Sequence, residues 1–212
     1  MTGTTTPQTT TAPAGTDERT VFVLADEALL AVVRQVREDQ WDLRTRGTVT
    51  TSDPDGDPTL RELVNYHAYD DAWVPAMLAG RTMAEVGQDA HTGDLLGADP
   101  VAAFERIAQD AIAAAQGLDD LDRTVHCSFG DYSARDYLWQ VIAFRALRAV
   151  EIARLIGVDD RLEPELVEPL LAHLRVHAEE WRSYGVFGPA LPAPDGATPQ
   201  EELLALTGRR PR

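Results

Sequence analysis

Residues 59–80 read TLRELVNYHAYDDAWVPAMLAG and carry a complete helix signal. Thr59 followed by Glu62 has the spacing of a capping box, in which each side chain bonds the backbone N–H of the other residue. Apolar residues then recur at intervals of three and four, which predicts an amphipathic helix that ends at Gly80. Pro75 is expected to bend its last turn. The buried face is predicted to carry Leu60, Leu63, Val64, His67, Asp71, Val74 and Leu78.

The rest of the chain repeats this helical pattern without an internal repeat. Asp99-Pro100 combines an N-cap with a proline at the first helical position, and Gly157 is a typical helix end. Long amphipathic segments without paired strands predict an all-α, up-and-down four-helix bundle with a short extended segment and a small C-terminal helix. We expect helices over residues 19–38, 99–117, 133–156, 163–183 and 199–206, a connection over 45–58, a short helix plus a Gly-rich loop over 81–97, and a short strand or extended arm over 123–131.

Composition limits the classes of function. The 212 residues carry a formal net charge of −16, from 35 acidic side chains and 19 basic ones that are all arginine. Such an acidic, lysine-free chain disfavours binding to nucleic acid or to an anionic membrane surface. No stretch approaches the roughly 18 apolar residues of a membrane span. The single cysteine, Cys127, excludes an intramolecular disulfide and is compatible with the cytoplasm, where we expect the protein.

The length suits one domain. Residues 1–18 are rich in Thr and Pro and lack the basic and apolar regions of a secretory signal, so we interpret them as a disordered tail. Residues 19–212 are expected to form a single helical domain.

Six stretches together resemble the actinobacterial branch of the DinB-like superfamily, which includes the metal-binding domain of mycothiol-dependent maleylpyruvate isomerase. The resemblance covers residues 19–211, in order and with few gaps. The C-terminal stretch is the most distinctive of the six. They are DQWDLRT (39–45), LRELVNYHAYDDAWVPAMLAG (60–80), GADPVAAFERIAQDAIAAAQG (97–117), LDRTVHCSFGDYSARDYL (121–138), RAVEIARLIG (148–157) and FGPALPAPDGATPQEELLALTGRRP (187–211).

The resemblance implies a four-helix bundle that holds a divalent metal, zinc or nickel, between two helices. Its ligands would be a histidine on the second helix and, on the later long helix, an acid or histidine four residues before another histidine. The first position matches His67, but the other two are Phe144 and Arg148, while the acid that follows is kept as Glu151. A guanidinium offers no lone pair to a metal, so we expect no metal cofactor at these positions.

Arg148 falls on the predicted apolar stripe of its helix, as does Arg145, and a buried charge needs partners. We expect Arg148 to take the place of the metal charge and to pair with Asp71, with Glu151 one turn away and His67 beside them. Asp70 is expected to face solvent.

The candidate catalytic residues are therefore His67 as acid or base, Arg148 and Asp71, and the candidate substrate-binding residues are Phe144, Trp73 and Glu151.

Other residues invite weaker hypotheses. His173 and His177 have the i, i+4 spacing of zinc ligands, but a solvated surface pair is the preferred interpretation. Cys127 follows His126 in an extended segment, where neighbouring side chains point to opposite faces, so a structural thiol is preferred to a nucleophile.

Three hypotheses for the function stay open at this point. The first is a metal-independent small-molecule enzyme, a transferase or isomerase of the mycothiol-dependent type, working in a pocket of the bundle core. The second is a non-catalytic, metal-free bundle that binds a ligand or forms oligomers, and in which Arg148 makes a structural ion pair. The third is a metal site with ligands that we have not identified. A homodimer is compatible with all three, and no motif fixes one.

Overall fold

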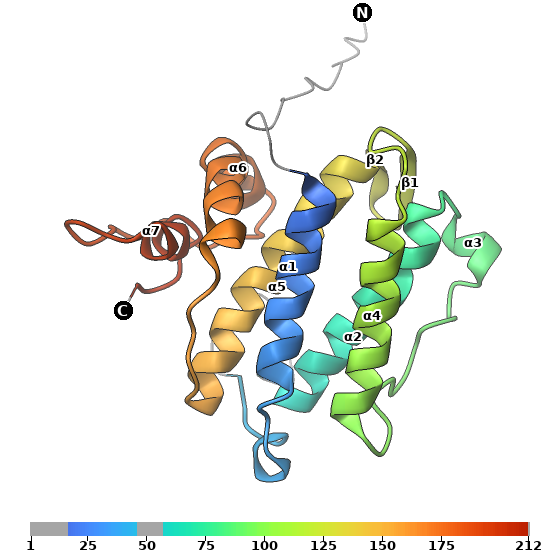
Figure 1. Ribbon diagram of the computed structural model, residues 1–212, viewed down its shortest axis with the longest axis horizontal. Coiled ribbons are helices and arrows are strands. Elements are labelled where there is room, and N and C mark those ends of the chain that lie inside the picture. The colour runs from blue at the N-terminus through green and yellow to red at the C-terminus, as the bar shows by residue number, and fades with distance from the viewer. Residues whose placement is uncertain (1–16, 46–56, 212) are drawn as a thin grey trace, which may run out of the picture.

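The computed structural model describes residues 17–45 and 57–211, and within them the chain is mainly α-helical with one small sheet (Figure 1). All but the last two residues of the predicted tail, and most of the predicted connection over 45–58, lie outside this part. The elements in chain order are α1 (Glu18–Val33), the 3-10 helix η1 (Glu38–Gln40), α2 (Leu60–Leu78), α3 (Met83–Val86), α4 (Pro100–Gln116), β1 (Thr124–Cys127), β2 (Gly130–Ser133), α5 (Ala134–Ile156), α6 (Pro164–Ser183) and α7 (Pro199–Leu206).

Capping residues set the helix ends where the sequence predicts them. Thr59 and Glu62 form the capping box of α2, with the Glu62 carboxylate accepting from the Thr59 backbone N–H at 2.8 Å. Asp99 caps α4, which begins at Pro100. Gly157 ends α5 with a φ of 77°, a left-handed conformation that favours glycine.

Two predicted elements differ from the structure. Helix α1 ends at Val33 rather than near residue 38, because the chain turns there into η1, although Val36 still reaches the core. The segment predicted as a short strand or extended arm over 123–131 is part of an antiparallel hairpin of two short strands, in which Thr124 pairs with Ser133 and Cys127 with Gly130.

Helices α1 and α5 run in the same direction. At their N-terminal ends the Arg135 guanidinium pairs with the buried carboxylate of Glu18. At the other ends the Gln40 side chain, just after α1, donates to the backbone carbonyl of Ile156 at 3.2 Å. Contacts at both ends therefore hold the two helices in parallel.

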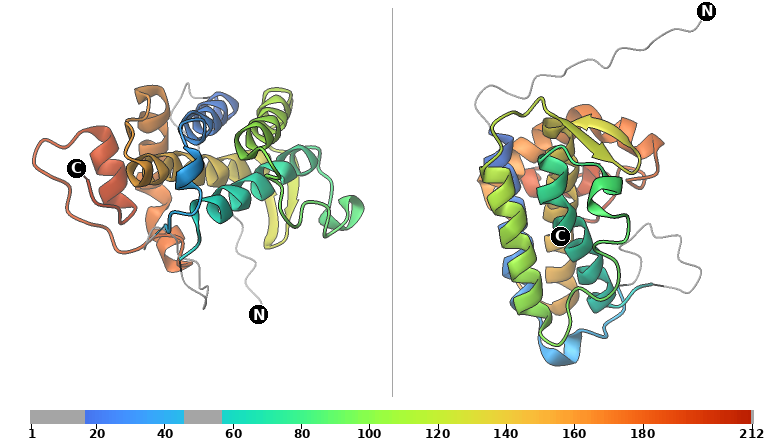
Figure 2. Two further views of the ribbon diagram at one scale, coloured as in Figure 1. Left: turned by 90° about the horizontal axis from the view of Figure 1, so that it is seen from below. Right: turned by 90° about the vertical axis from the view of Figure 1, so that its right-hand side faces the viewer.

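Helices α2 and α4 also run in parallel, and in the direction opposite to α1 and α5. Arg61 at the start of α2 donates to the Gly97 carbonyl just before α4, at 2.7 Å. Arg123, just after α4, donates to the Leu78 carbonyl at the end of α2, at 3.1 Å. The connection over residues 79–99 returns the chain to the other end, so the order is not the strict alternation that an up-and-down bundle implies. Figure 2 shows α1 and α4 lying across α5 and α2.

A polar layer divides the core at the middle of the helices. The apolar cluster on one side includes Phe22, Val74 and Leu138, and the cluster on the other side includes Leu29, Val64 and Ile152. On α4 the two apolar clusters meet between Ala108 and Ala111, whose small side chains leave room for large polar groups from the other helices. The buried polar side chains of the layer are Asp26 on α1, His67 and Asp71 on α2, and Arg145 and Arg148 on α5.

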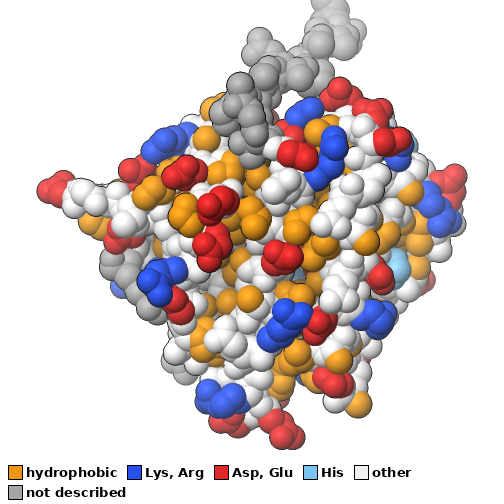
Figure 3. All heavy atoms as spheres, in the orientation of Figure 1, with side chains coloured by type: hydrophobic (Ala, Val, Ile, Leu, Met, Phe, Trp, Pro, Cys, Tyr) orange, Lys and Arg blue, Asp and Glu red, His pale blue; other side chains and the backbone are white. Residues whose placement is uncertain are grey.

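The surface, unlike the core, carries many charged side chains. On the face built by α1 and α4, acidic and basic side chains are interspersed among apolar ones, with no broad basic area on that face (Figure 3). No helix in the described part of the chain has the length and apolar character that a membrane crossing requires.

Candidate functional site

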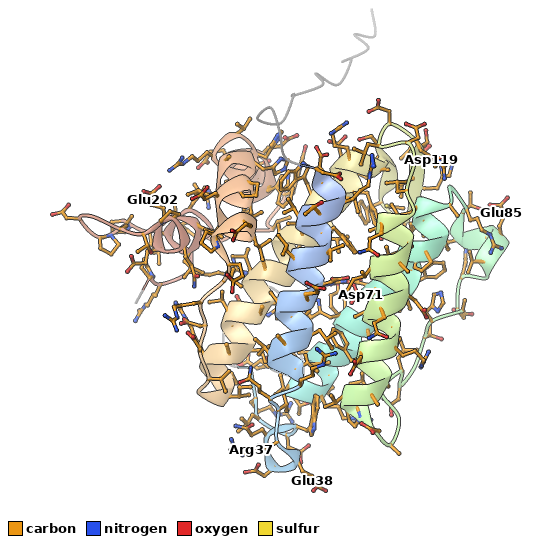
Figure 4. All side chains as sticks on the ribbon, viewed as in Figure 1. Arg37, Glu38, Asp71, Glu85, Asp119 and Glu202 are labelled. Atoms are coloured by element: carbon orange, nitrogen blue, oxygen red, sulfur yellow. The ribbon has the colours of Figure 1, made fainter. Side chains whose placement is uncertain are left out.

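Three helices supply the candidate site. On α2, His67 and Asp71 are one turn apart and therefore share a face. Arg145 and Arg148 have the corresponding relationship on α5. Helices α2 and α5 contact each other much less than α1 contacts α5 or α2 contacts α4, so long arginine side chains span the space between them. Figure 4 shows Asp71 at mid-height, behind α1 and α4.

Arg145 lies at the centre of the buried polar cluster, which is formed by Asp26, His67, Asp71, Arg145 and Arg148. Its side chain is only 1% exposed. Its Nε donates to Oδ1 of Asp71 at 2.8 Å, and its Nη2 donates to the same oxygen. The Nε also lies 3.3 Å from Oδ1 of Asp26 on α1, and Nη1 lies 2.6 Å from Nδ1 of His67. Burial disfavours the charge, but the surrounding carboxylates outweigh it and raise the pKa of Arg145. The guanidinium therefore joins three helices as a permanent cation.

His67 lies between two guanidinium groups and is 1% exposed. Arg148 Nε donates to its Nε2 at 2.9 Å, while Arg145 approaches Nδ1. Burial, together with Arg145 and Arg148, holds the pKa of His67 well below its usual range, so the ring is neutral. A neutral imidazole has one lone pair and one N–H. Both ring nitrogens face guanidinium donors, so in either tautomer the one lone pair lies against an arginine and no ring nitrogen is left to ligate a metal.

Arg148 makes a second contact with an acid on its own helix. Its Nη1 donates to Oε2 of Glu151 at 2.6 Å, and Oε1 of Glu151 accepts from Nε of Arg209 at 2.8 Å. Burial, opposed by Glu151, lowers the pKa of Arg148. These contacts form a polar network that extends from α1 to the C-terminal segment. Its members are Asp26, Asp71, Arg145, His67, Arg148, Glu151 and Arg209.

The predicted partnership between Arg148 and Asp71 is wrong, because Asp71 is bound by Arg145. Helices α2 and α5 are antiparallel, so the residue one turn further along α2 lies opposite a residue one turn earlier on α5. His67 accordingly meets Arg148, and Asp71 meets Arg145.

Asp70 also departs from expectation: its side chain is one-third exposed, and its carboxylate lies 3.8 Å from Nη1 of Arg145. Burial raises the pKa of Asp70 to about 6, while Arg145 opposes this shift.

The predicted substrate-binding residues have three different environments. Glu151 belongs to the network. Phe144 is 40% exposed. Trp73 is buried beside Tyr69 and His91, with its ring centroid 4.7 Å from that of His91, and its Nε1 has no hydrogen-bond partner among the described residues.

Asp26 is absent from the residues predicted for the site, and Arg145 is predicted only to lie on the apolar stripe of its helix. Both residues are charged side chains within an apolar row of a helix, which indicates a buried ion pair. Asp26 interrupts an apolar row on α1 that runs through Phe22, Leu29 and Val33, and all three are buried. A carboxylate in such a row needs a buried cation, and the predicted apolar stripe of the later helix contains one in Arg145.

The two histidines of α6 are stacked rather than simply solvated. The ring of His173 lies parallel to Trp139 at a centroid distance of 4.3 Å, and His177 stacks on it at 4.4 Å. Burial, followed by His177, lowers the pKa of His173 to about 3. Within residues 17–45 and 57–211, no three His, Cys, Asp or Glu side chains are grouped so that they could hold a metal ion.

Cys127 is half-buried on the hairpin. Burial, with a smaller contribution from Asp131, raises the pKa of its thiol to about 11, which disfavours the nucleophilic thiolate. The neighbouring His126 is engaged elsewhere, with Nδ1 2.8 Å from Oδ1 of Asp131. These observations agree with a structural thiol.

A surface groove of about 500 Å³ lies away from this cluster, between α6, α7 and the loop over residues 190–197. Its apolar wall includes Leu171 and Leu191, and the ion pair of Arg175 with Glu202 lies at the groove. None of the cluster residues lines it.

The fold and the cluster together define a class: a mainly α-helical protein with a buried layer of arginine, histidine and carboxylate side chains. Neither a family model, nor a curated protein, nor a solved structure matches the chain.

Proposed function

We propose that this protein is a metal-free, DinB-like helical bundle that acts by binding, as a ligand-binding or self-associating module, and not by metal catalysis. In the related isomerase domain, the resemblance puts the metal at the positions of His67, Phe144 and Arg148. The donor set of this chain does not fit a metal there. Phe144 has no donor atom, and Arg148 brings a cation of its own.

The observation that carries the proposal is the position of His67 between two guanidinium groups, at 2.6 and 2.9 Å. The ring is buried and neutral, and both its nitrogens face guanidinium donors, so it lacks both a free lone pair and access to solvent. A catalytic acid or base must exchange a proton with its substrate, which requires contact with it. His67 is thus better suited to positioning the two arginines than to catalysis.

Metal binding tests this proposal directly. The purified full chain is dialysed against zinc or nickel and its metal content is measured, together with the shift of its thermal unfolding midpoint. We expect neither a stoichiometric metal nor a higher midpoint. The matched control is Phe144→Asp/Arg148→His, which restores the donor pattern of the family and is expected to gain metal. Stoichiometric metal in the wild-type protein would contradict the proposal.

Self-association and ligand binding are separated by the mass of the protein in solution. Light scattering over a range of concentrations gives either a dimer or a monomer. A dimer supports the self-associating form of the module, and a monomer supports the ligand-binding form.

The second candidate is a metal-independent enzyme, a transferase or isomerase acting on small thiol-linked substrates. Asp70 is the observation in its favour. Its carboxylate is partly accessible, lies beside Arg145 and has a pKa of about 6, which suits proton transfer near neutral pH. Conversion of maleylpyruvate in the presence of mycothiol, measured for the wild-type protein and Asp70→Asn, tests it. Turnover that the variant loses would favour the enzyme, and its absence favours the binding module.

A further inference from the structure

Two carboxyl groups from different helices face one guanidinium in the interior. Asp26 on α1 and Asp71 on α2 are 1% and 0% exposed, and Arg145 is 1% exposed. Both Oδ1 atoms approach the same Nε of Arg145, at 3.3 and 2.8 Å. Two ionised carboxylates sharing one cation would leave a net negative charge in a medium of low dielectric, which is strongly unfavourable.

The hydrogen bonds of this pair are incomplete. Both oxygens of Asp26, and Oδ2 of Asp71, are buried without a hydrogen-bond donor among the described residues. Arg145 does not supply the missing donors, because Nε and Nη2 donate to Oδ1 of Asp71, Nη2 also donates to the His67 carbonyl, and Nη1 faces the His67 ring and the Asp70 carboxylate. An ionised carboxylate only accepts, whereas a protonated one also has an O–H to donate.

We infer that Asp26 keeps its proton in the folded protein at neutral pH, so that its O–H adds a donor to a cluster whose carboxylate oxygens lack donors. The pair then holds one proton and one negative charge opposite the single charge of Arg145. The negative charge belongs to Asp71, because Asp71 receives two hydrogen bonds from Arg145 and Asp26 has only the longer ion-pair contact. This is a buried proton site formed by α1 and α2, separate from the candidate catalytic residues named above apart from Asp71.

Burial and the neighbouring acid favour the protonated form of Asp26, against the effect of Arg145. Burial and then the charge of Asp71 raise the pKa of Asp26 well above its usual range, and Arg145 opposes them. Asp70 adds a further acid 3.8 Å from Arg145, and His67 beside it is neutral. Because the folded pKa of Asp26 lies above the unfolded one, the stability that its proton contributes is complete at low pH. It is lost as the pH rises through the folded pKa.

Replacement of each acid by its amide separates the two roles. In Asp26→Asn the side chain stays neutral and keeps a donor, so we expect an unfolding midpoint in urea equal to or above that of the wild type, with less decline at alkaline pH. In Asp71→Asn the guanidinium loses its anion, so we expect a clearly lower midpoint. Asp39→Asn, at a surface carboxylate that is 75% exposed, is the control and should change neither property.

An infrared difference spectrum gives a readout that does not depend on whether Asp71→Asn folds. At neutral pH, wild type minus Asp26→Asn is expected to contain the carbonyl band of a protonated carboxylic acid. Absence of that band, or an Asp26→Asn variant as destabilised as Asp71→Asn, would overturn the inference.

Discussion

The Nε of Arg145 on α5 donates to Oδ1 of Asp71 on α2 at 2.8 Å, and both side chains are almost completely buried. This contact joins two helices that otherwise pack little against each other. A buried ion pair of this kind adds little stability over apolar packing, but breaking it leaves an isolated buried charge. We therefore expect the free energy of unfolding to fall strongly when only one member of this pair is replaced.

Arg145→Met tests this expectation. The substitution keeps an apolar stem and removes the cation, so Asp71 is left buried and unpaired. We expect a loss of about 3–5 kcal/mol in the free energy of unfolding, measured by urea denaturation. Removal of both groups in Arg145→Met/Asp71→Leu should recover most of the loss. Arg161→Ala, at a pair that is mostly exposed, is the control and should change little. An equal loss in the single and double variants would contradict this account.

His173 gives the protein a sensitivity to acid. Its pKa is about 3 in the folded protein, against an ordinary value of 6.5. Because the unfolded chain binds this proton first, the stability contributed by neutral His173 is present above pH 6.5 and is lost as the pH falls toward 3. His173→Phe keeps a ring to stack on Trp139 and cannot titrate. We expect its free energy of unfolding to fall less steeply than that of the wild type below pH 6.5. Parallel pH curves for the two proteins would show that His173 is not responsible.

Arg209 fastens the C-terminal segment to the polar network through Glu151. The bond at 2.8 Å is partly exposed to solvent, so we expect Arg209→Ala to cost only about 1 kcal/mol of global stability. The local effect should be larger, with faster amide hydrogen exchange over residues 206–210. Arg210→Ala is the matched control, because Arg154 binds the backbone carbonyl of Arg210 and not its side chain. Unchanged exchange in Arg209→Ala would rule out this fastening role.

Cys127 should react slowly with alkylating reagents. Its thiol has a pKa of about 11, so the thiolate is scarce at neutral pH. We expect alkylation by iodoacetamide at pH 8 to be much slower than for a cysteine in an unstructured peptide, and to accelerate toward pH 11. Asp131→Asn removes a nearby negative charge and should increase the rate, as followed by mass spectrometry. A rate equal to that of the peptide would contradict the burial of this thiol.

Local sequence signals predicted the starts of α2 and α4 and the end of α5. Thr59 with Glu62, Asp99 before Pro100, and Gly157 act within one turn of backbone, so their effect can be recognised without knowledge of the neighbouring elements. The positions of Arg145 and Arg148 on a buried stripe were also predictable, because helical periodicity depends on spacing alone. Both arginines are indeed buried.

The partners in the core were decided only by the tertiary structure. Which arginine meets Asp71 depends on the antiparallel alignment of α2 with α5, a relation between segments more than 70 residues apart. The role of Asp26 depends on α1 lying against the same point of α5. Spacing within one helix carries no information on the register of another, and an electrostatic contact is decided by distances of a few ångströms. Helical spacing was therefore enough to predict the main helices and the burial of His67, Asp71, Arg145 and Arg148, whereas the burial of Asp26 and the charge pairs of these residues depend on how the helices pack.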